Sequence, residues 1–317
     1  MAGVKRSLAV DLAGVQLPLP VVAAAGCFGL SRDIAGLADL RRLGGIVTRS
    51  LTYGPSKGSP TPRVAETPSG ILTSVGTQNP GVEEFLREEL PRLERTGLPV
   101  IASVTGSSLA EYLQVTSTLH WRSGLAALEV YLSGPDAERG GVPFYARIDR
   151  MAEIVGAVSR LSRLPVFAKL PLLVPDLVEA ARACVRAGAH GLTLIDAVPG
   201  MAVDVERLRP KLATAVGGLS GPAIRPIAVG AVFRVARAMP DVPIMGVGGI
   251  VTGQDAVEFL LAGAWAVQVG TAMLVNPSAP MEVAQGILAY LRAKGLSSPA
   301  DLRGRLRVAE PGEKPER

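Results

Sequence analysis

Two glycine turns are the residues of this chain whose type and spacing most clearly indicate chemistry. Each ends a short apolar run, in GVGGI at 246–250 and in AVQVGT at 266–271, and each stands just before a segment that begins like a helix. Glycine lets the backbone approach a ligand closely, and successive N–H groups at the start of a helix bind phosphate. We therefore expect a phosphate-bearing cofactor at four backbone donors, those of Gly248, Gly249, Gly270 and Thr271.

A second set of residues could carry charge or move protons. Lys169 is the only charged residue in the apolar run 165–170, which argues against a lysine that merely reaches the surface. The run 125–132 leads into a loop that holds Ser133, Gly134, Pro135 and Asp136. Asp136 is a candidate proton acceptor, and the alternative is a turn residue that caps the loop backbone. Tyr131 could contact a ligand, or it could be a rim tyrosine that packs under the loop.

Composition narrows the classes of protein to which the chain can belong. Lys and Arg number 33 against 28 acids, and the net charge of +5 is scattered instead of forming a basic stripe, so nucleic-acid binding is not expected. Two cysteines, Cys27 and Cys184, are too few for a disulfide framework and favour the cytoplasm. No uninterrupted apolar run is long enough to cross a membrane. His120 and His190 are expected to be structural, and no metal site is expected.

Short apolar runs alternate along the chain with longer segments that have apolar residues at helical spacing. The runs are 21–28, 45–50, 99–106, 125–132, 165–170, 191–196, 243–250 and 266–273. The helical segments include 82–97, 149–163, 176–190, 226–239 and 252–264. Eight such units predict a closed (β/α)8 barrel with a parallel sheet, and an open doubly wound sheet is the alternative.

The remaining segments complete a prediction of one domain over residues 1–317. Residues 8–20 are expected to form a hairpin that caps the bottom of the barrel, and the tail after Leu302 is expected to be frayed. Residues 51–80 are expected to form a long loop that folds over the site. Chemistry in such barrels lies at the carboxyl ends of the strands, where the glycine turns, Lys169 and the loop after residue 132 would meet.

Five stretches of the chain resemble the FMN-containing dihydroorotate dehydrogenase family, in particular its cytosolic class, which includes a branch that works with an iron–sulfur partner subunit. They are TPRVAETPSG (61–70), QNPGVEEF (78–85), GGLSGPAIRPIA (217–228), GVGGIVTGQDAVEFLLAGA (246–264) and AVQVGT (266–271). The resemblance covers nearly the whole chain from AAGCFG (24–29) onward. It implies a (β/α)8 barrel with FMN across its top, and it does not by itself imply the reaction.

The resemblance implies that most cofactor contacts are present. Small residues of the first strand would let the flavin approach the backbone, and Lys169 would face the flavin ring, where a reduced flavin carries negative charge. The expected cofactor contacts are Ala24, Ala25, Gly26, Lys169, Ile195, Ser220, Gly221, Gly248, Gly249, Gly270 and Thr271.

The residues that would meet the substrate depart from the family pattern. The catalytic base, a cysteine in the cytosolic class, aligns with Gly134, and a shift of one position would bring Ser133 there instead. Asparagines that bind the orotate ring are replaced by Thr73, Tyr131, Asp136 and Asp196, and a lysine is replaced by Arg49. Each mismatched contact costs roughly 1–3 kcal/mol, so dihydroorotate is expected to be a poor substrate unless Ser133 or Asp136 serves as the base.

Three function classes follow. The first is an FMN oxidoreductase of the dihydroorotate dehydrogenase type, which passes a hydride from dihydroorotate or a related small cyclic substrate to flavin N5 and belongs to pyrimidine biosynthesis. The second is a non-catalytic FMN-binding homologue that scaffolds or regulates a partner, and the third has lost flavin. The family implies a homodimer and an iron–sulfur or flavin electron-transfer subunit. Direct nicotinamide binding is not expected, because GVGGIVTG lacks the G-x-G-x-x-G placement after a first strand.

Overall fold

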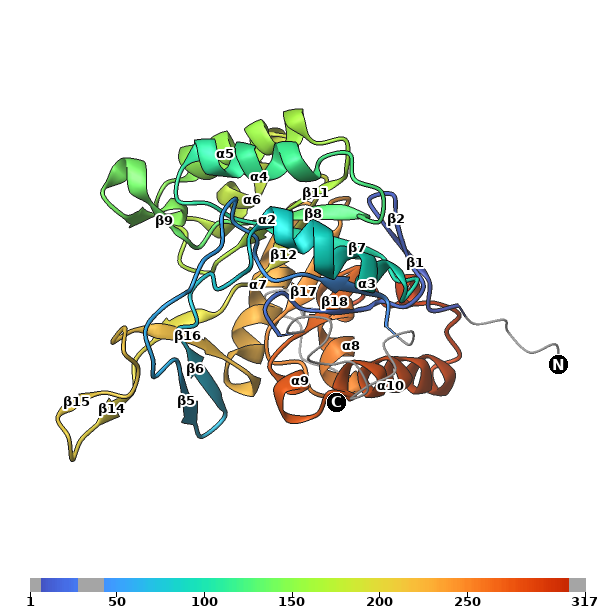
Figure 1. Ribbon diagram of the computed structural model, residues 1–317. Helices are drawn as coiled ribbons and strands as arrows, with labels where there is room; N and C mark the ends of the chain where they lie inside the picture. Colours follow the sequence, from blue (N-terminus) through green and yellow to red (C-terminus); the bar gives the residue numbers. More distant parts are fainter. Residues whose placement is uncertain (1–6, 28–42, 308–317) are drawn as a thin grey trace.

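A closed barrel of parallel strands forms the centre of the computed structural model, which describes residues 7–27 and 43–307 (Figure 1). Around the barrel the strand order is β11, β12, β17, β18, β3, β4, β7 and β8. The strands are β3 (Val21–Ala23), β4 (Gly45–Val47), β7 (Val100–Val104), β8 (Ala127–Tyr131), β11 (Val166–Leu170), β12 (Gly191–Leu194), β17 (Ile244–Val247) and β18 (Ala266–Val269). Each lies within one of the eight apolar runs, so the prediction of a (β/α)8 barrel is confirmed, and the open sheet is excluded.

The strands have apolar residues on both faces because both faces are buried. Side chains of successive residues alternate between the barrel interior and the helical layer. A lower interior layer contains Val22, Val47, Ile101, Ala127, Phe167, Met245 and Ala266. Hairpin β1 (Val10–Leu12) and β2 (Val15–Leu17) packs against this layer with three buried side chains and closes the bottom of the barrel, as predicted.

Helices surround the strands and bury their apolar faces on the outside of the barrel. They are α2 (Val82–Glu84), α3 (Leu90–Glu94), α4 (Leu109–Leu119), α5 (Ile148–Leu161), α6 (Leu177–Arg186), α7 (Arg225–Ala238), α8 (Gly253–Ala262), α9 (Ala272–Val275) and α10 (Ala279–Ala293). The predicted helix 82–97 is interrupted by a π-helical turn, Phe85–Glu89, which ends two residues before Pro91 in the first turn of α3. Proline has no N–H and its ring crowds the preceding turn, so a regular α-helix cannot continue there.

Additional β structure covers the carboxyl end of the barrel. Strands β5 (Val64–Thr67) and β6 (Gly70–Thr73) form a sheet with β13 (Val198–Gly200) and β16 (Gly217–Ser220). Hairpin β14 (Val203–Asp204) and β15 (Arg209–Pro210) projects beyond it, on the side of the barrel away from β1 and β2 (Figure 1). The segment 51–80 is therefore not a loop throughout. A third of it, β5 to β6, is a hairpin that pairs with the chain after β12.

Two sequence predictions concern residues that the structure describes only in part. The first apolar run includes Phe28, and the predicted frayed tail includes 308–317, and these residues lie outside the described ranges. Within residues 7–27 and 43–307, no helix is long and apolar enough to span a membrane.

Candidate active site at the carboxyl end of the barrel

A layer of polar side chains lies inside the barrel directly above its apolar lower layer. Glu129, Lys169 and Gln268 each stand two residues after a side chain of that lower layer, so strand alternation directs them to the interior as well. Thr193 is paired with Lys169 across β11 and β12. All four are buried, and Lys169, the most exposed of them, is 5% exposed. Buried charges require partners, and these residues supply them to one another.

Glu129 is the centre of this layer. The Thr193 hydroxyl and the Gln268 amide both donate hydrogen bonds to Glu129 Oε2, at 2.8 and 2.7 Å. The other oxygen, Oε1, lies 3.5 Å from Lys169 Nζ. Burial by itself lowers the pKa of Lys169, but the charges of Glu129 and Asp196 outweigh it, and the pKa is raised. Lys169 is therefore a protonated ammonium whose position is set by Glu129.

Sequence analysis did not identify Glu129 or Gln268. The signal was present, because Glu129 is the only charge in LAALEVYL just as Lys169 is in its own run. A lone charge in an apolar strand therefore marks Glu129, two residues before Tyr131, as well as Lys169.

Above this layer, charged and polar side chains stand at the strand ends. Tyr131 ends β8, Asp196 follows β12, and Arg49 follows β4, and all three are half-buried. The Asp196 charge, together with burial, raises the pKa of the Tyr131 phenol well above its usual value. Tyr131 is thus a hydrogen-bond donor at neutral pH and not a ready proton acceptor.

Cys27 is a further residue at this end of the barrel for which sequence analysis proposed no role. Burial raises the pKa of its thiol, although Lys169 and Arg49 act in the opposite direction. A side chain at position 270 would approach Cys27 Sγ to 3.2 Å, so the turn after β18 passes close to the thiol. The thiol is protonated at neutral pH, which makes it a poor nucleophile.

The two glycine turns present free backbone donors, as a phosphate site requires. Among the described residues, no backbone carbonyl accepts a hydrogen bond from the N–H of Gly248, Gly249, Gly270 or Thr271. Gly249 has φ +75°, and a Cβ there would stand 2.8 Å from the carbonyl oxygen of Gly221. Only glycine fits a backbone that doubles back so closely.

Neighbouring residues hold these turns in place. Thr252 caps α8 in a capping box with Asp255. The Thr271 hydroxyl donates to Ser220 Oγ at 2.8 Å and so joins the turn after β18 to β16. Free N–H groups at the turns and a buried ammonium at Lys169 fit the two ends of a flavin mononucleotide, one a phosphate and the other a ring that gains negative charge.

The other expected cofactor residues lie near these elements. Ala24 is buried directly after β3, and its N–H donates to Val269 O at 2.9 Å, which places it beside β18. Ala25 and Gly26 continue that turn. Ile195 is buried after β12 and donates to Val247 O at 3.1 Å. Their contacts with a cofactor stay predictions.

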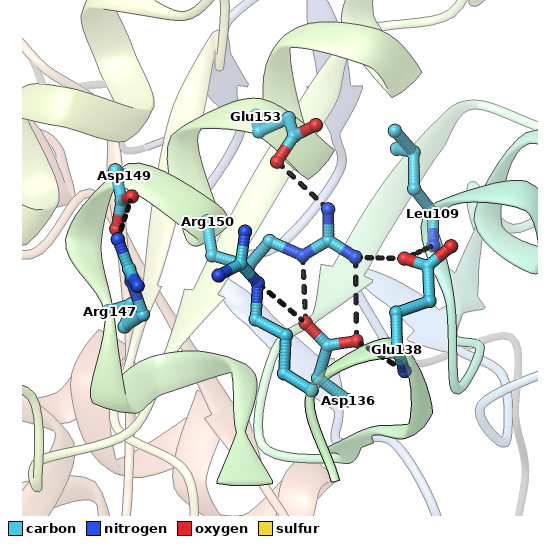
Figure 2. A network of polar contacts seen from close by, with 8 residues as sticks. Leu109, Asp136, Glu138, Arg147, Asp149, Arg150 and Glu153 are labelled. Carbon is cyan, nitrogen blue, oxygen red and sulfur yellow. Dashed lines mark hydrogen bonds and ion pairs between the residues drawn. The ribbon is translucent and has the colours of Figure 1, made fainter. Parts of the chain in front are cut away.

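Asp136 lies in an ion-pair network behind the loop after β8 (Figure 2). Arg150 of α5 donates to Asp136 Oδ2 through Nε at 2.8 Å and to Oδ1 through Nη2 at 3.4 Å. Arg150 also pairs with Glu138, and with Glu153 at 2.8 Å. Asp136 is 1% exposed. Because Arg150 occupies both carboxylate oxygens, we infer that Asp136 caps the loop and does not accept a proton from a substrate.

The remaining loop and sheet residues frame the site. Gly134 is buried, and a Cβ added to it would meet nothing closer than Gly106 O at 3.8 Å. The Ser133 hydroxyl is buried and has no hydrogen-bond partner among the described residues. Thr73 ends β6 and pairs with Gly218 of β16, so it belongs to the covering sheet.

The histidines lie elsewhere. His120 follows α4, and His190, just before β12, accepts a hydrogen bond at Nδ1 from Val166 N at 3.1 Å. Across the part of the chain that the structure describes, no three His, Cys, Asp or Glu side chains gather as metal ligands.

Comparison with known proteins gives a likeness over nearly the full chain. The family model described as dihydroorotate dehydrogenase matches residues 7–291. A protein of Geotalea daltonii, the catalytic subunit of dihydroorotate dehydrogenase B (NAD(+)), is 44% identical over 304 residues, which are 96% of this chain and 99% of that protein. The subunits of the same name from Desulforudis audaxviator and Geotalea uraniireducens are 45% and 43% identical, over 95% of this chain and 97% and 99% of theirs.

Proposed function

The chain belongs to the dihydroorotate dehydrogenase family, and on that premise we propose that it is an FMN-dependent oxidoreductase that oxidises dihydroorotate or a related small cyclic substrate. The observation that carries the proposal is that two features occur at the same end of the barrel. One is the set of free N–H donors at the two glycine turns, and the other is the buried, protonated Lys169. No observation favours the non-catalytic alternative or a barrel that has lost flavin.

Each part of the site has a role in this proposal. FMN, when bound, supplies the acceptor for the hydride. Gly248, Gly249, Gly270 and Thr271 would donate to its phosphate. Lys169 would supply positive charge to the part of the ring that gains electrons, and Glu129 would hold the ammonium there. The lower apolar layer excludes water from beneath these charges, which strengthens their interaction.

The substrate side supports a substrate other than dihydroorotate. Gly134 has no side chain to accept a proton, Asp136 is occupied by Arg150, and the Tyr131 phenol stays protonated. Loss of a positioned base costs a factor of about 10² to 10⁴ in rate. We propose that turnover with dihydroorotate lies well below the range of roughly 1–10³ per second that is common for enzymes.

Partners and location follow from the same premise. The relatives are named catalytic subunits of dihydroorotate dehydrogenase B (NAD(+)). We propose that this chain also passes electrons to a partner subunit that carries flavin or an iron–sulfur cluster, that it forms a homodimer, and that it works in the cytoplasm in pyrimidine metabolism. The chain itself would be a single FMN-binding domain.

Anaerobic reduction of the FMN-loaded protein tests the proposal. Dihydroorotate in excess is expected to bleach the flavin slowly, and orotate is expected to inhibit the bleaching. A protein whose flavin is reduced by dithionite but not by dihydroorotate or by other dihydropyrimidines would contradict the proposal. Rapid bleaching, with turnover inside the common range, would support the oxidoreductase and refute the altered substrate.

A further inference from the structure

Two opposite charges stand across the mouth of the barrel from each other. Asp196 follows β12 and Arg49 follows β4. In the closed strand order, three strands separate β12 from β4 in either direction around the barrel, so the two residues stand on opposite sides. Lys169, on β11, lies inside the barrel beside β12.

Asp196 has no ion-pair partner within 4 Å in the described part of the chain. Its charge raises the pKa of Lys169, but that ammonium lies 3.5 Å from Glu129 Oε1. The Asp196 charge also raises the pKa of the Tyr131 phenol. A phenol donates at most one hydrogen bond, whereas an ionised carboxylate has about four acceptor positions. Asp196 is half-buried, so it has unused acceptor capacity at a place that is partly removed from water.

Arg49 is the complementary case. Its Nε is buried and has no hydrogen-bond partner among residues 7–27 and 43–307, and no carboxylate there forms an ion pair with it. Guanidinium is a donor only, and it binds carboxylates in a forked geometry. A buried N–H without a partner is costly, and a ligand that accepts from it removes that cost.

We propose that this site takes a small dipolar ring, with a carboxylate toward Arg49 and an amino or other N–H-donating nitrogen toward Asp196. The inference rests on the proposed function, because it concerns the substrate of that same oxidoreductase site. The proposed ligand differs from orotate at the end that faces Asp196. A ring carbonyl oxygen placed against Asp196 meets a negative charge and finds no donor, whereas an amino group there gains a charge-assisted hydrogen bond.

Calorimetric titration of the purified protein with three ligands of equal size tests this. The ligands are orotate and its two analogues in which an amino group replaces the ring carbonyl oxygen at C4 or at C2. For the wild-type protein, one of the amino analogues is expected to bind at least about tenfold more tightly than orotate, which is the contribution of one charge-assisted contact. In Asp196→Asn the preference is expected to disappear or reverse, because an amide can also donate.

The control is Asp241→Asn, which removes an exposed carboxylate outside the site and is expected to keep the wild-type preference. Arg49→Gln is expected to weaken all three ligands together, since each keeps its carboxylate. Orotate that binds the wild-type protein as tightly as both analogues, or a preference unchanged in Asp196→Asn, would overturn the inference. Calorimetry does not depend on flavin, so a protein that prefers an amino analogue but takes up no FMN would contradict the proposed function and leave the ligand preference standing.

Discussion

At the scale of single residues, the pairing of Glu129 with Lys169 decides what the site can do. An ammonium that is 5% exposed would lose its proton readily without a counter-charge, because burial disfavours the charged form. Glu129 prevents this, and Thr193 and Gln268 satisfy the second oxygen of Glu129 so that the carboxylate stays in place. The positive charge near the proposed flavin thus depends on a residue that does not reach the ligand.

Glu129→Gln is therefore expected to lower the pKa of Lys169 and, with it, the midpoint potential of bound FMN. In the wild-type protein the raised pKa keeps Lys169 protonated from about pH 6 to 9, so its charge does not vary there. In the variant, burial still lowers the pKa of Lys169, but the charge of Glu129 no longer opposes it. Lys169 is therefore expected to lose its proton as pH rises through that range. The potential should then fall more steeply with pH than in the wild-type protein.

Spectroelectrochemical titration at several pH values measures this, with the exposed Glu83→Gln as the control variant. Equal potentials for the wild-type protein and Glu129→Gln at every pH would show that Glu129 does not set the charge of Lys169.

Gly134→Cys is a second prediction at this scale. The backbone allows the change, since the nearest atoms to an added Cβ lie 3.8 and 3.9 Å away. The variant is nevertheless expected to recover little of the factor of about 10² to 10⁴ attributed to a positioned base, because Thr73, Tyr131 and Asp196 still provide no amide donors. The rate of anaerobic flavin bleaching by dihydroorotate measures the recovery. A gain of that full size from the single substitution would show that the site is still tuned to orotate.

The sequence allowed some of these residues to be predicted and not others. Lys169 and the glycine turns were recognisable, because a lone charge in an apolar strand and a glycine pair after a strand are local signals. The partner of Asp136 was not recognisable, since Arg150 lies 14 residues away on a helix whose rotation about its axis decides which side chain meets the loop. Contacts across the barrel, such as Gln268 with Glu129, also depend on closure of the sheet.

At the scale of elements, the loop after β8 is fastened to α5 by Arg150. Only 7% of this side chain is exposed, and it contacts carboxylates of the loop and of its own helix (Figure 2). The neighbouring Asp136 shifts the pKa of the guanidinium further upward, in spite of burial. The loop that bears Ser133 and Gly134 therefore has a fixed path over the barrel.

Arg150→Met is expected to destabilise the protein by up to about 3–5 kcal/mol, because the buried Asp136 charge then keeps only the 3.8 Å ion pair with the exposed Arg139. Asp136→Asn is expected to cost less, since Arg150 keeps Glu138 and Glu153. Urea denaturation of the wild-type protein and both variants measures the free energies of unfolding. A cost below about 1 kcal/mol for Arg150→Met would mean that the loop is held by other contacts.

The elements themselves were predicted well where their pattern was regular. All eight barrel strands fall inside the predicted runs, and the hairpin at the bottom is as expected. Strands were predicted too long, because apolar residues continue past the last ladder pair into buried turns. The sheet of β5, β6, β13 and β16 was missed. Its two halves, β5 with β6 and β13 with β16, are joined only by the pairing of β6 with β16, which lie more than a hundred residues apart in the sequence.

At the scale of the whole molecule, the barrel separates stability from chemistry. The hairpin and the apolar lower layer close one end, while charged side chains and the glycine turns occupy the other. Such a barrel can change its substrate by altering loop and strand-end residues without rebuilding the core. We propose that Arg49, Tyr131, Gly134 and Asp196 are changes of this kind, and that the cofactor half of the site keeps the contacts that the resemblance to the family implies.

The flavin content of the purified protein decides whether this barrel binds FMN. We expect a yellow protein that releases FMN on denaturation in an amount equimolar with the chain. We also expect that Lys169→Ala, titrated with FMN after removal of the bound flavin, binds FMN more weakly or holds it at a shifted potential while it unfolds like the wild-type protein. A colourless protein that takes up no added FMN, or a Lys169→Ala variant with unchanged affinity and potential, would show that the site is not a flavin site built around Lys169.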